Sequence, residues 1–277
     1  MLRSILVALD STPASAAAQR LAVDLAKRHD CDLTGFAVLD RAHITPPMAV
    51  GIGGMAYKEH LDKVKLEEAR TFIAELEKSF RQICEAAGIR WQMLASEGIP
   101  HRLVEQESDR HDLLVIGKDT DFHFDFDPEP AATVLRLLRD NSRPVLVCPP
   151  EVATDGPVLA AYDGSVRSSR ALHMLALLGH IKDRPVHVLS IADTEEEAER
   201  RAGLLTELFA KHGYNATPHG VATEADPAEI ILAEVNALGA TLVGMGTSGH
   251  SRLHDFFLGS ATQRLLEACP CPMFVYH

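Results

Sequence analysis

Ile5-Leu-Val-Ala-Leu-Asp10-Ser11 and Val158-Leu-Ala-Ala-Tyr-Asp163-Gly164-Ser165 share one pattern, an apolar run that ends in an aspartate and a small polar residue. Each run precedes an Ala- and Leu-rich stretch with helical spacing of its apolar residues, at 15–27 and 167–178. Strands that are apolar throughout, instead of alternating, are typical of a parallel sheet covered by helices on both faces. The two stretches therefore predict a repeated α/β unit.

The repeat extends to the end of the sequence. Three further pairs of segments correspond: 98–104 and 225–231, 113–117 and 242–246, and 144–147 and 272–275. Each copy reads β-α-β-α-β-α-β-α-β, which predicts an α/β fold of two tandem doubly wound domains, each a five-stranded parallel sheet with helices on both faces. We expect these domains at residues 1–150 and 155–277, joined by the Pro- and Gly-containing stretch 149–156. Ligands of such sheets bind beyond the carboxyl ends of the strands, where the strand order reverses.

The two copies differ in length. Asp10 and Asp163 are 153 residues apart, whereas Pro100 and Pro227 are 127 apart, so the second copy lacks 26 residues between these points. The Pro- and Gly-rich segment 41–57 has no helical or alternating pattern and predicts a loop over the sheet edge in the first copy. A long amphipathic helix is predicted at 58–87, and its shorter counterpart at 194–212.

Composition excludes several classes of protein. The 277 residues carry a formal net charge of −12, which argues against nucleic-acid binding and against an anionic membrane surface. The hydrophobic fraction is 46%, with no apolar run long enough to cross a bilayer, and the first residues lack a secretory cleavage pattern. Five cysteines without framework spacing fit a reducing cytoplasm, so a cytoplasmic location is expected.

Glycines follow the fourth apolar run of the second copy. Gly246-Thr-Ser-Gly249 is separated by nine residues from Gly259-Ser260-Ala-Thr262, which opens a predicted helix. Backbone N–H groups there can approach a phosphate, and a helix N-terminus favours an anion. The stretch 244–249 also reads G-x-G-x-x-G, but it follows the fourth strand instead of the first, and no Gly-Lys-Ser/Thr completes a P-loop. The alternative is that these glycines only make a turn.

These residues resemble those of the ATP-binding universal stress proteins, whose G-x2-G-x9-G-[S/T] pattern corresponds to Gly246, Gly249, Gly259 and Ser260, with Asp163 at the end of strand one. The resemblance covers essentially the whole sequence as a tandem pair. It implies an adenine nucleotide alpha hydrolase-like fold with strand order 3-2-1-4-5. It also implies ATP across the carboxyl edge of the sheet. Mg²⁺ or Mn²⁺ would come with the nucleotide itself.

The resemblance further assigns residues to the nucleotide. Asp163 and the backbone at Ala161 and Ile191 would contact the adenosine. The ribose and phosphates would contact a second group: Met245, Gly246, Gly249, Gly259, Ser260, Ala261 and Thr262. We expect His250 and Arg252 over the phosphates. Asp163 has a second interpretation as the N-cap of the helix after it.

The corresponding loop of the first copy has lost this chemistry. Thr120 stands where Gly249 stands, Pro130 and Ala131 replace Gly259 and Ser260, and five acidic residues lie between 119 and 129. Proline removes an N–H donor, and the carboxylates repel a triphosphate, so one competent nucleotide site per chain is predicted, in the second copy. Asp119, Asp121 and His123 are weak candidates for a divalent cation, and a solvated acidic loop is the favoured alternative. Phe122, Phe124 and Phe126 alternate with the acids, which predicts that one side of the loop packs inward.

Two functions are compatible with these patterns. The first is a cytoplasmic stress-response protein regulated by ATP in its second domain, without a catalytic role. The second is a slow ATPase or nucleotide-processing enzyme, with the first domain binding another ligand or a divalent metal. Cys269 and Cys271 are interpreted as buried apolar residues and not as a redox pair. The closing runs 145–147 and 273–275 predict an internal pseudo-dimer of the two domains, with a homodimer as a further option.

Overall fold

The computed structural model describes residues 1–48, 54–122, 132–247 and 260–277. The strands of the first half are β1 (Ser4–Ala8), β2 (Asp32–Leu39), β3 (Trp91–Glu97), β4 (Leu113–Gly117) and β5 (Val145–Cys148). Those of the second half are β6 (Val158–Ala161), β7 (Val186–Ala192), β8 (Ala216–Ala222), β9 (Leu242–Gly246) and β10 (Met273–Tyr276).

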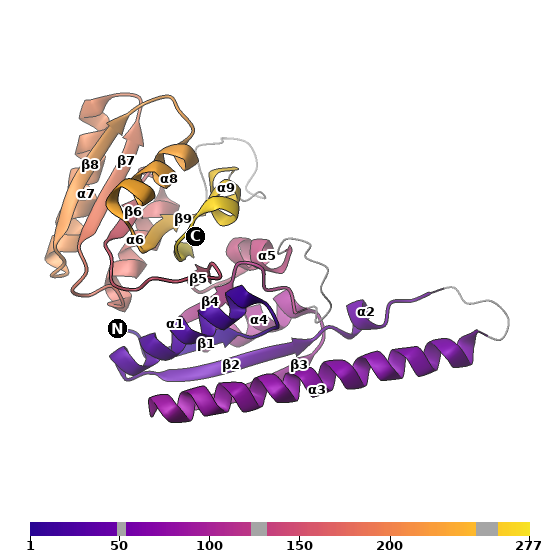
Figure 1. Ribbon diagram of the computed structural model, residues 1–277. Coiled ribbons are helices and arrows are strands. Elements are labelled where there is room, and N and C mark those ends of the chain that lie inside the picture. Colours follow the sequence, from indigo (N-terminus) through magenta and orange to yellow (C-terminus); the bar gives the residue numbers. More distant parts are fainter. Residues whose placement is uncertain (49–53, 123–131, 248–259) are drawn as a thin grey trace.

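Helices connect the parallel strands of each half (Figure 1). The first half contains α1 (Pro13–His29), α2 (Arg41–Ile44), α3 (Met55–Ala87), α4 (Pro100–Ser108) and α5 (Ala132–Asp140). The second half contains α6 (Val166–Leu178), α7 (Glu195–Lys211), α8 (Pro227–Leu238) and α9 (Ser260–Ala268). Within the residues that the structure describes, every helix is too short or too polar to cross a lipid bilayer.

All ten strands belong to one sheet of order β3-β2-β1-β4-β5-β10-β9-β6-β7-β8. Each half therefore has the order 3-2-1-4-5 and is parallel throughout, which confirms the predicted α/β class. The halves meet at an antiparallel pair, β5 with β10, in which Met273 lies opposite Val147 and Val275 opposite Val145. These are the two closing runs on which the sequence places the contact between its copies.

The strands are apolar throughout because both of their faces are buried. In β1, Ile5 and Val7 belong to the core on one face of the sheet, and Leu6 and Ala8 to the core on the other. All four are fully buried. Alternate side chains of a strand point to opposite faces, so a sheet covered on both sides needs an apolar residue at every position.

The helix after the first strand of each half begins with the same cap. The Thr12 hydroxyl accepts a hydrogen bond from the Ser15 N–H at 3.1 Å, and the Ser165 hydroxyl accepts one from the Ser168 N–H at 3.1 Å. A capping hydroxyl satisfies an N–H that the first helical turn leaves unpaired. This cap begins each helix directly after the aspartate that ends the strand, Asp10 or Asp163.

The prediction of a loop over 41–57 is wrong at both ends. Residues Arg41–Ile44 form α2, whose first turn is capped by the Asp40 side chain, which accepts from the His43 N–H at 3.2 Å. Helix α3 begins at Met55, three residues before the predicted start, and its predicted end at Ala87 is confirmed. Figure 1 shows that the N-terminal part of α3 extends past the end of β2. Residues 49–53 lie outside the described part.

Candidate functional site

A cavity of about 530 Å³ lies at the carboxyl ends of β6, β7 and β9 in the second half. Strands β6 and β9 are neighbours in the sheet but not consecutive in the half, so the order reverses between them. Doubly wound sheets bind ligands at such a point, because the loops on either side of it diverge. The volume is within the range of small-molecule sites. The candidate site thus lies at the edge of the sheet that the sequence predicts.

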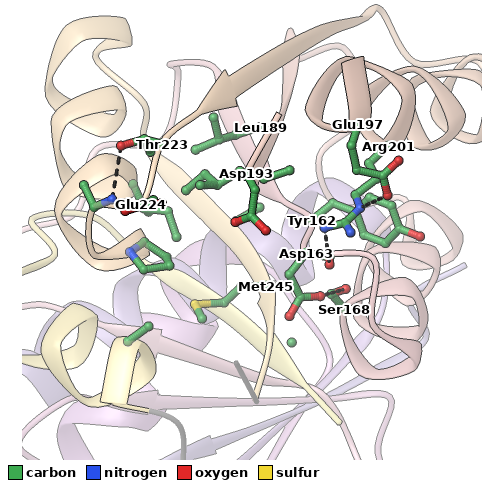
Figure 2. A pocket seen from close by; sticks show the side chains of 18 of the residues that line it. Tyr162, Asp163, Ser168, Leu189, Asp193, Glu197, Arg201, Thr223, Glu224 and Met245 are labelled. Carbon is green, nitrogen blue, oxygen red and sulfur yellow. Dashed lines mark hydrogen bonds and ion pairs between the residues drawn. The ribbon is translucent and has the colours of Figure 1, made fainter. Parts of the chain in front are cut away.

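Asp163 stands at one side of the cavity (Figure 2). Its Oδ1 accepts hydrogen bonds from the Ser165 N–H at 2.9 Å and from the Ser168 hydroxyl. Because Ser165 caps α6 and Ser168 lies in its first turn, these bonds fix the carboxylate against the start of the helix. Asp163 is only half-buried, so the same group also faces the cavity. The interpretation of Asp163 as the N-cap of α6 is wrong, because Ser165 is the N-cap and Asp163 lies two residues before it, where it accepts from the Ser165 N–H.

An arginine and a glutamate of α7 line the same side of the cavity as Asp163. Arg201 Nε donates to Glu197 Oε1 at 2.7 Å, and Arg201 Nη1 donates to the Asp163 carbonyl at 3.1 Å. Hydrogen bonds from Arg200 and Arg201 lower the pKa of Glu197 to about 2. The ion pair thus remains charged at neutral pH and holds the turn after β6 in place. Gly164, with φ of +81°, lets that turn approach Arg201, since a Cβ there would lie 3.2 Å from Nε.

The walls of the cavity are mostly apolar. They come from β7, α8 and β9, through Leu189, Ile191, Ile231 and Met245. Thr223 and Glu224 lie across the cavity from Asp163 (Figure 2), and the Thr223 hydroxyl accepts from the Ala225 N–H at 3.1 Å. Apolar walls with polar groups at two ends suit a flat ring system that carries hydrogen-bonding substituents.

The glycine segment after β9 is described only at its two ends. Gly246 borders the cavity, and its α-carbon lies against α6: a Cβ there would be 2.6 Å from the Ser168 nitrogen. The Thr262 hydroxyl donates to the Thr247 carbonyl at 3.4 Å, which links the start of α9 to the end of β9. Ser260 is the first residue of α9 and is exposed.

The structure brings most of the described candidate residues together. Seven of them line the cavity: Ala161, Asp163, Ile191, Met245, Gly246, Ala261 and Thr262. Ser260 adjoins this group at the start of α9. Gly249, His250, Arg252 and Gly259 lie outside the described residues. Sequence reasoning missed Tyr162, Glu197, Arg201, Thr223 and Glu224, which the cavity also includes. The acidic Thr194-Glu-Glu-Glu start of α7 is the one signal near Glu197, and by itself it indicates only a helix N-terminus.

Only two of the three weak metal candidates belong to the described part of the chain. Over residues 1–48, 54–122, 132–247 and 260–277, no group of three or more His, Cys, Asp or Glu side chains is arranged to hold a metal ion. Asp119 and Asp121 belong to these ranges, and His123 lies outside them. Cys269 and Cys271 are both buried, with their sulfur atoms 3.6 Å apart.

The first-half counterpart of Asp163 has different surroundings. Asp10 is 4% exposed, and its carboxylate accepts from the Thr12 N–H at 2.9 Å, the Thr12 hydroxyl at 2.8 Å and the Asp121 N–H at 3.2 Å. Burial raises the pKa of Asp10 above its usual value, against the opposing effect of the Thr12 hydrogen bonds. The carboxylate is thus enclosed by its own half of the chain.

Comparisons with known proteins agree with this architecture. A crystal structure of a universal stress protein from Archaeoglobus fulgidus has a TM-score of 0.71 at 19% identity, covering 99% of this chain and 97% of that one. A candidate universal stress protein from Pseudomonas aeruginosa has a TM-score of 0.60 at 19% identity, covering 99% and 93%. At these identities the two likenesses support the fold alone.

Comparison of the sequences also identifies the family. A universal stress protein of Synechocystis is 25% identical over 254 residues, which are 88% of this chain and 86% of that protein. The model of the universal stress protein family matches residues 1–119 and 156–277, so both halves are included. The chain therefore belongs to the universal stress protein family.

Proposed function

We propose that the second half binds one adenine nucleotide, with ATP as the physiological ligand, and that the protein acts as a nucleotide-regulated component of a cytoplasmic stress response. The observation that carries the proposal is the cavity itself. It lies where the strand order reverses, it joins apolar walls to Asp163, and it reaches the start of α9 through Ala261 and Thr262.

Each part of the ligand has a matching part of the cavity. The adenine ring is placed between the apolar side chains of Ile191, Ile231 and Met245. A carboxylate accepts hydrogen bonds only, so Asp163 suits a ribose hydroxyl or an amino group of the base. The phosphates extend toward α9, where the positive end of the helix dipole and the N–H groups of its first turn favour an anion. Mg²⁺ or Mn²⁺ would arrive with the phosphates, since these ions favour phosphate oxygens.

The first half takes no part in this binding. Its counterpart of the carboxylate, Asp10, is buried under hydrogen bonds from Thr12 and Asp121. Asp119 and Asp121 stand at the sequence positions of Ser248 and His250 in the second half, and their negative charges would repel phosphates. We propose that the first half instead serves as the permanent partner of the second, in an internal pseudo-dimer held by β5 and β10.

Two aspartates at equivalent positions give a matched test. Asp163→Asn replaces an acceptor-only carboxylate by an amide that also donates, and a hydrogen bond to a charged group contributes about 1.5–3 kcal/mol. We expect calorimetry to show about a tenfold or larger rise in the Kd for ATP in this variant. Asp10→Asn makes the same change in the first half and should leave the Kd unchanged. Equal effects of the two substitutions would contradict the assignment of the site.

Stoichiometry provides the second readout. Mass spectrometry of the natively purified chain should find one ATP per chain, and two per chain would refute the assignment to the second half alone. Sustained phosphate release that Asp163→Asn abolishes would identify hydrolysis, and not binding alone, as the activity.

A further inference from the structure

The two halves can be compared residue by residue through their strand registers. Ala8 pairs with Phe36 as Ala161 pairs with Leu189, and Ile5 pairs with Leu113 as Val158 pairs with Leu242. The cavity residues on β6, β7 and β9 therefore have definite counterparts, and Ile231 is matched to Val104 through the corresponding segments 225–231 and 98–104. The counterparts of Ala161, Asp163, Leu189, Ile191, Ile231, Met245 and Gly246 are Ala8, Asp10, Phe36, Val38, Val104, Ile116 and Gly117, in that order.

These counterparts are as suitable for a ring as the second-half walls, but they are closed off. Ala161 and Ile191 are partly exposed at the cavity, and Ile231 and Met245 are 5% and 7% exposed. Their counterparts Ala8, Val38, Val104 and Ile116 are all 0% exposed. Something in the first half covers the apolar residues that in the second half face a cavity.

The segment after β4 supplies the cover. The Thr120 N–H donates to the Gly117 carbonyl at 3.1 Å, which turns the chain back toward the sheet. The Asp121 N–H then donates to Asp10 Oδ2 at 3.2 Å, so the turn reaches the end of β1. The next residue, Phe122, is 0% exposed and belongs to the same buried cluster as Ala8, Phe36, Val38, Val104 and Ile116.

The backbone at Phe122 adopts a conformation that this residue type disfavours. Its φ of +63° lies in the left-handed region, where the Cβ of an L-residue is crowded. Such a conformation persists only where the surrounding structure holds the residue in it. The Phe122 side chain is fully buried in the apolar cluster that also holds these counterparts, and this burial fixes the segment in its conformation.

We propose that the first half contains a second nucleoside-type pocket whose occupant is the chain's own Phe122. The ring takes the place of a planar heterocycle, and Asp121 N–H takes the place of the hydrogen-bond donor that such a ligand would offer to Asp10. Emptied of Phe122, the pocket would accept a flat aromatic ring with an N–H or O–H donor, such as adenosine. A nucleotide triphosphate suits it poorly, because Asp119 and Asp121 are adjacent.

Phe122→Gly is the direct test, because glycine removes the ring and accepts a φ of +63° without crowding. Phe122→Leu is the matched control, since it keeps an apolar side chain in the pocket. Calorimetric titration with adenosine should give one site per chain in the native protein and in Phe122→Leu, and two sites in Phe122→Gly. One site in a folded Phe122→Gly chain would overturn the proposal.

A stability readout covers the case in which Phe122→Gly folds poorly. Adenosine should then raise its melting temperature more than it raises that of the native chain, because the ligand fills the vacated space. An equal shift in both proteins would also overturn the proposal. The site gained on substitution is independent of the second-half site. If the native chain binds neither ATP nor adenosine, the proposed function fails, while a gain of one adenosine site in Phe122→Gly still supports this inference.

Discussion

Gly246 offers a prediction that separates the structural and ligand-binding roles of a glycine. Its α-carbon packs against the start of α6, so that a Cβ would lie 2.6 Å from the Ser168 nitrogen and 2.8 Å from the Ser168 α-carbon. Both neighbours are backbone atoms within the first turn of a helix whose cap is fixed by Ser165. Unlike a flexible side chain, they have no alternative rotamer with which to make room. In Gly246→Ala, β9 and α6 must therefore separate.

The cost follows from that displacement. The 2.6 Å separation must increase to the roughly 3.4 Å of ordinary contact, and overpacking of this kind destabilises a core by about 1–3 kcal/mol. We expect Gly246→Ala to lose about 2 kcal/mol of unfolding free energy, which lowers the melting temperature by about 4–8 °C. Adenine nucleotide affinity should fall as well, because the same displacement moves Ser168 and Asp163 at the cavity.

Two other glycines are the controls for this substitution. Gly117→Ala makes the equivalent change in the first half, where a Cβ would lie 2.5 Å from the Ser15 nitrogen, and should destabilise the chain without changing nucleotide affinity. Gly203 lies inside α7, where a Cβ would meet no described atom within 4 Å, and Gly203→Ala should stabilise by about 0.5–1 kcal/mol. Thermal unfolding by circular dichroism and titration calorimetry measure both quantities. A Gly246→Ala chain as stable as the native one would refute the packing argument.

Two further predictions concern buried polar groups. Burial lowers the pKa of His180 to about 3, and neither ring nitrogen has a hydrogen-bond partner among the described residues. Below about pH 6.5 the unfolded chain binds a proton at this site and the folded chain does not, so the free energy of unfolding should fall on acidification from pH 6.5 toward 3. In His180→Phe the melting temperature, measured at successive pH values, should fall less steeply over this range. An unchanged slope would contradict this account. Burial also raises the pKa of Cys31 to about 11 and of Cys84 to about 12, so a thiol reagent should modify these residues only after unfolding, and rapid modification of the native chain would argue against their buried role.

The sequence carried most of the information on the fold because its apolar runs repeat. A strand such as Ile5–Ala8 is buried on both faces, and that requirement is visible in every one of its residues. The short helix α2 was missed because its stabilising bond, from His43 N–H to Asp40, is local and leaves no apolar period. The start of α3 at Met55 was missed because the glycines just before it are typical of a loop.

Site residues at the end of a strand were predictable from the sequence. Site residues that reach the cavity through contacts between distant parts of the chain were not. Asp163 and Gly246 each terminate an apolar run, so their positions at the sheet edge follow from topology. Arg201 reaches the Asp163 carbonyl only because α7 packs beside the turn after β6, a contact between residues 38 apart in sequence. Inward packing of one side of the Phe122 segment is predicted from alternation, but the pocket that the ring enters depends on the registers of β1, β2 and β4.

The antiparallel pairing of β5 with β10 has a consequence for how this chain can evolve. A dimer of two separate copies of one domain dissociates on dilution. Both of its contact surfaces are also encoded by the same gene segment, so a substitution changes both at once. Here the two strands are part of one polypeptide, so the partnership does not depend on protein concentration, and each strand can change without altering the other. Selection can then act on each half separately. The second half can keep an open cavity, while the first half closes its own and still supplies the strand that pairs with β10.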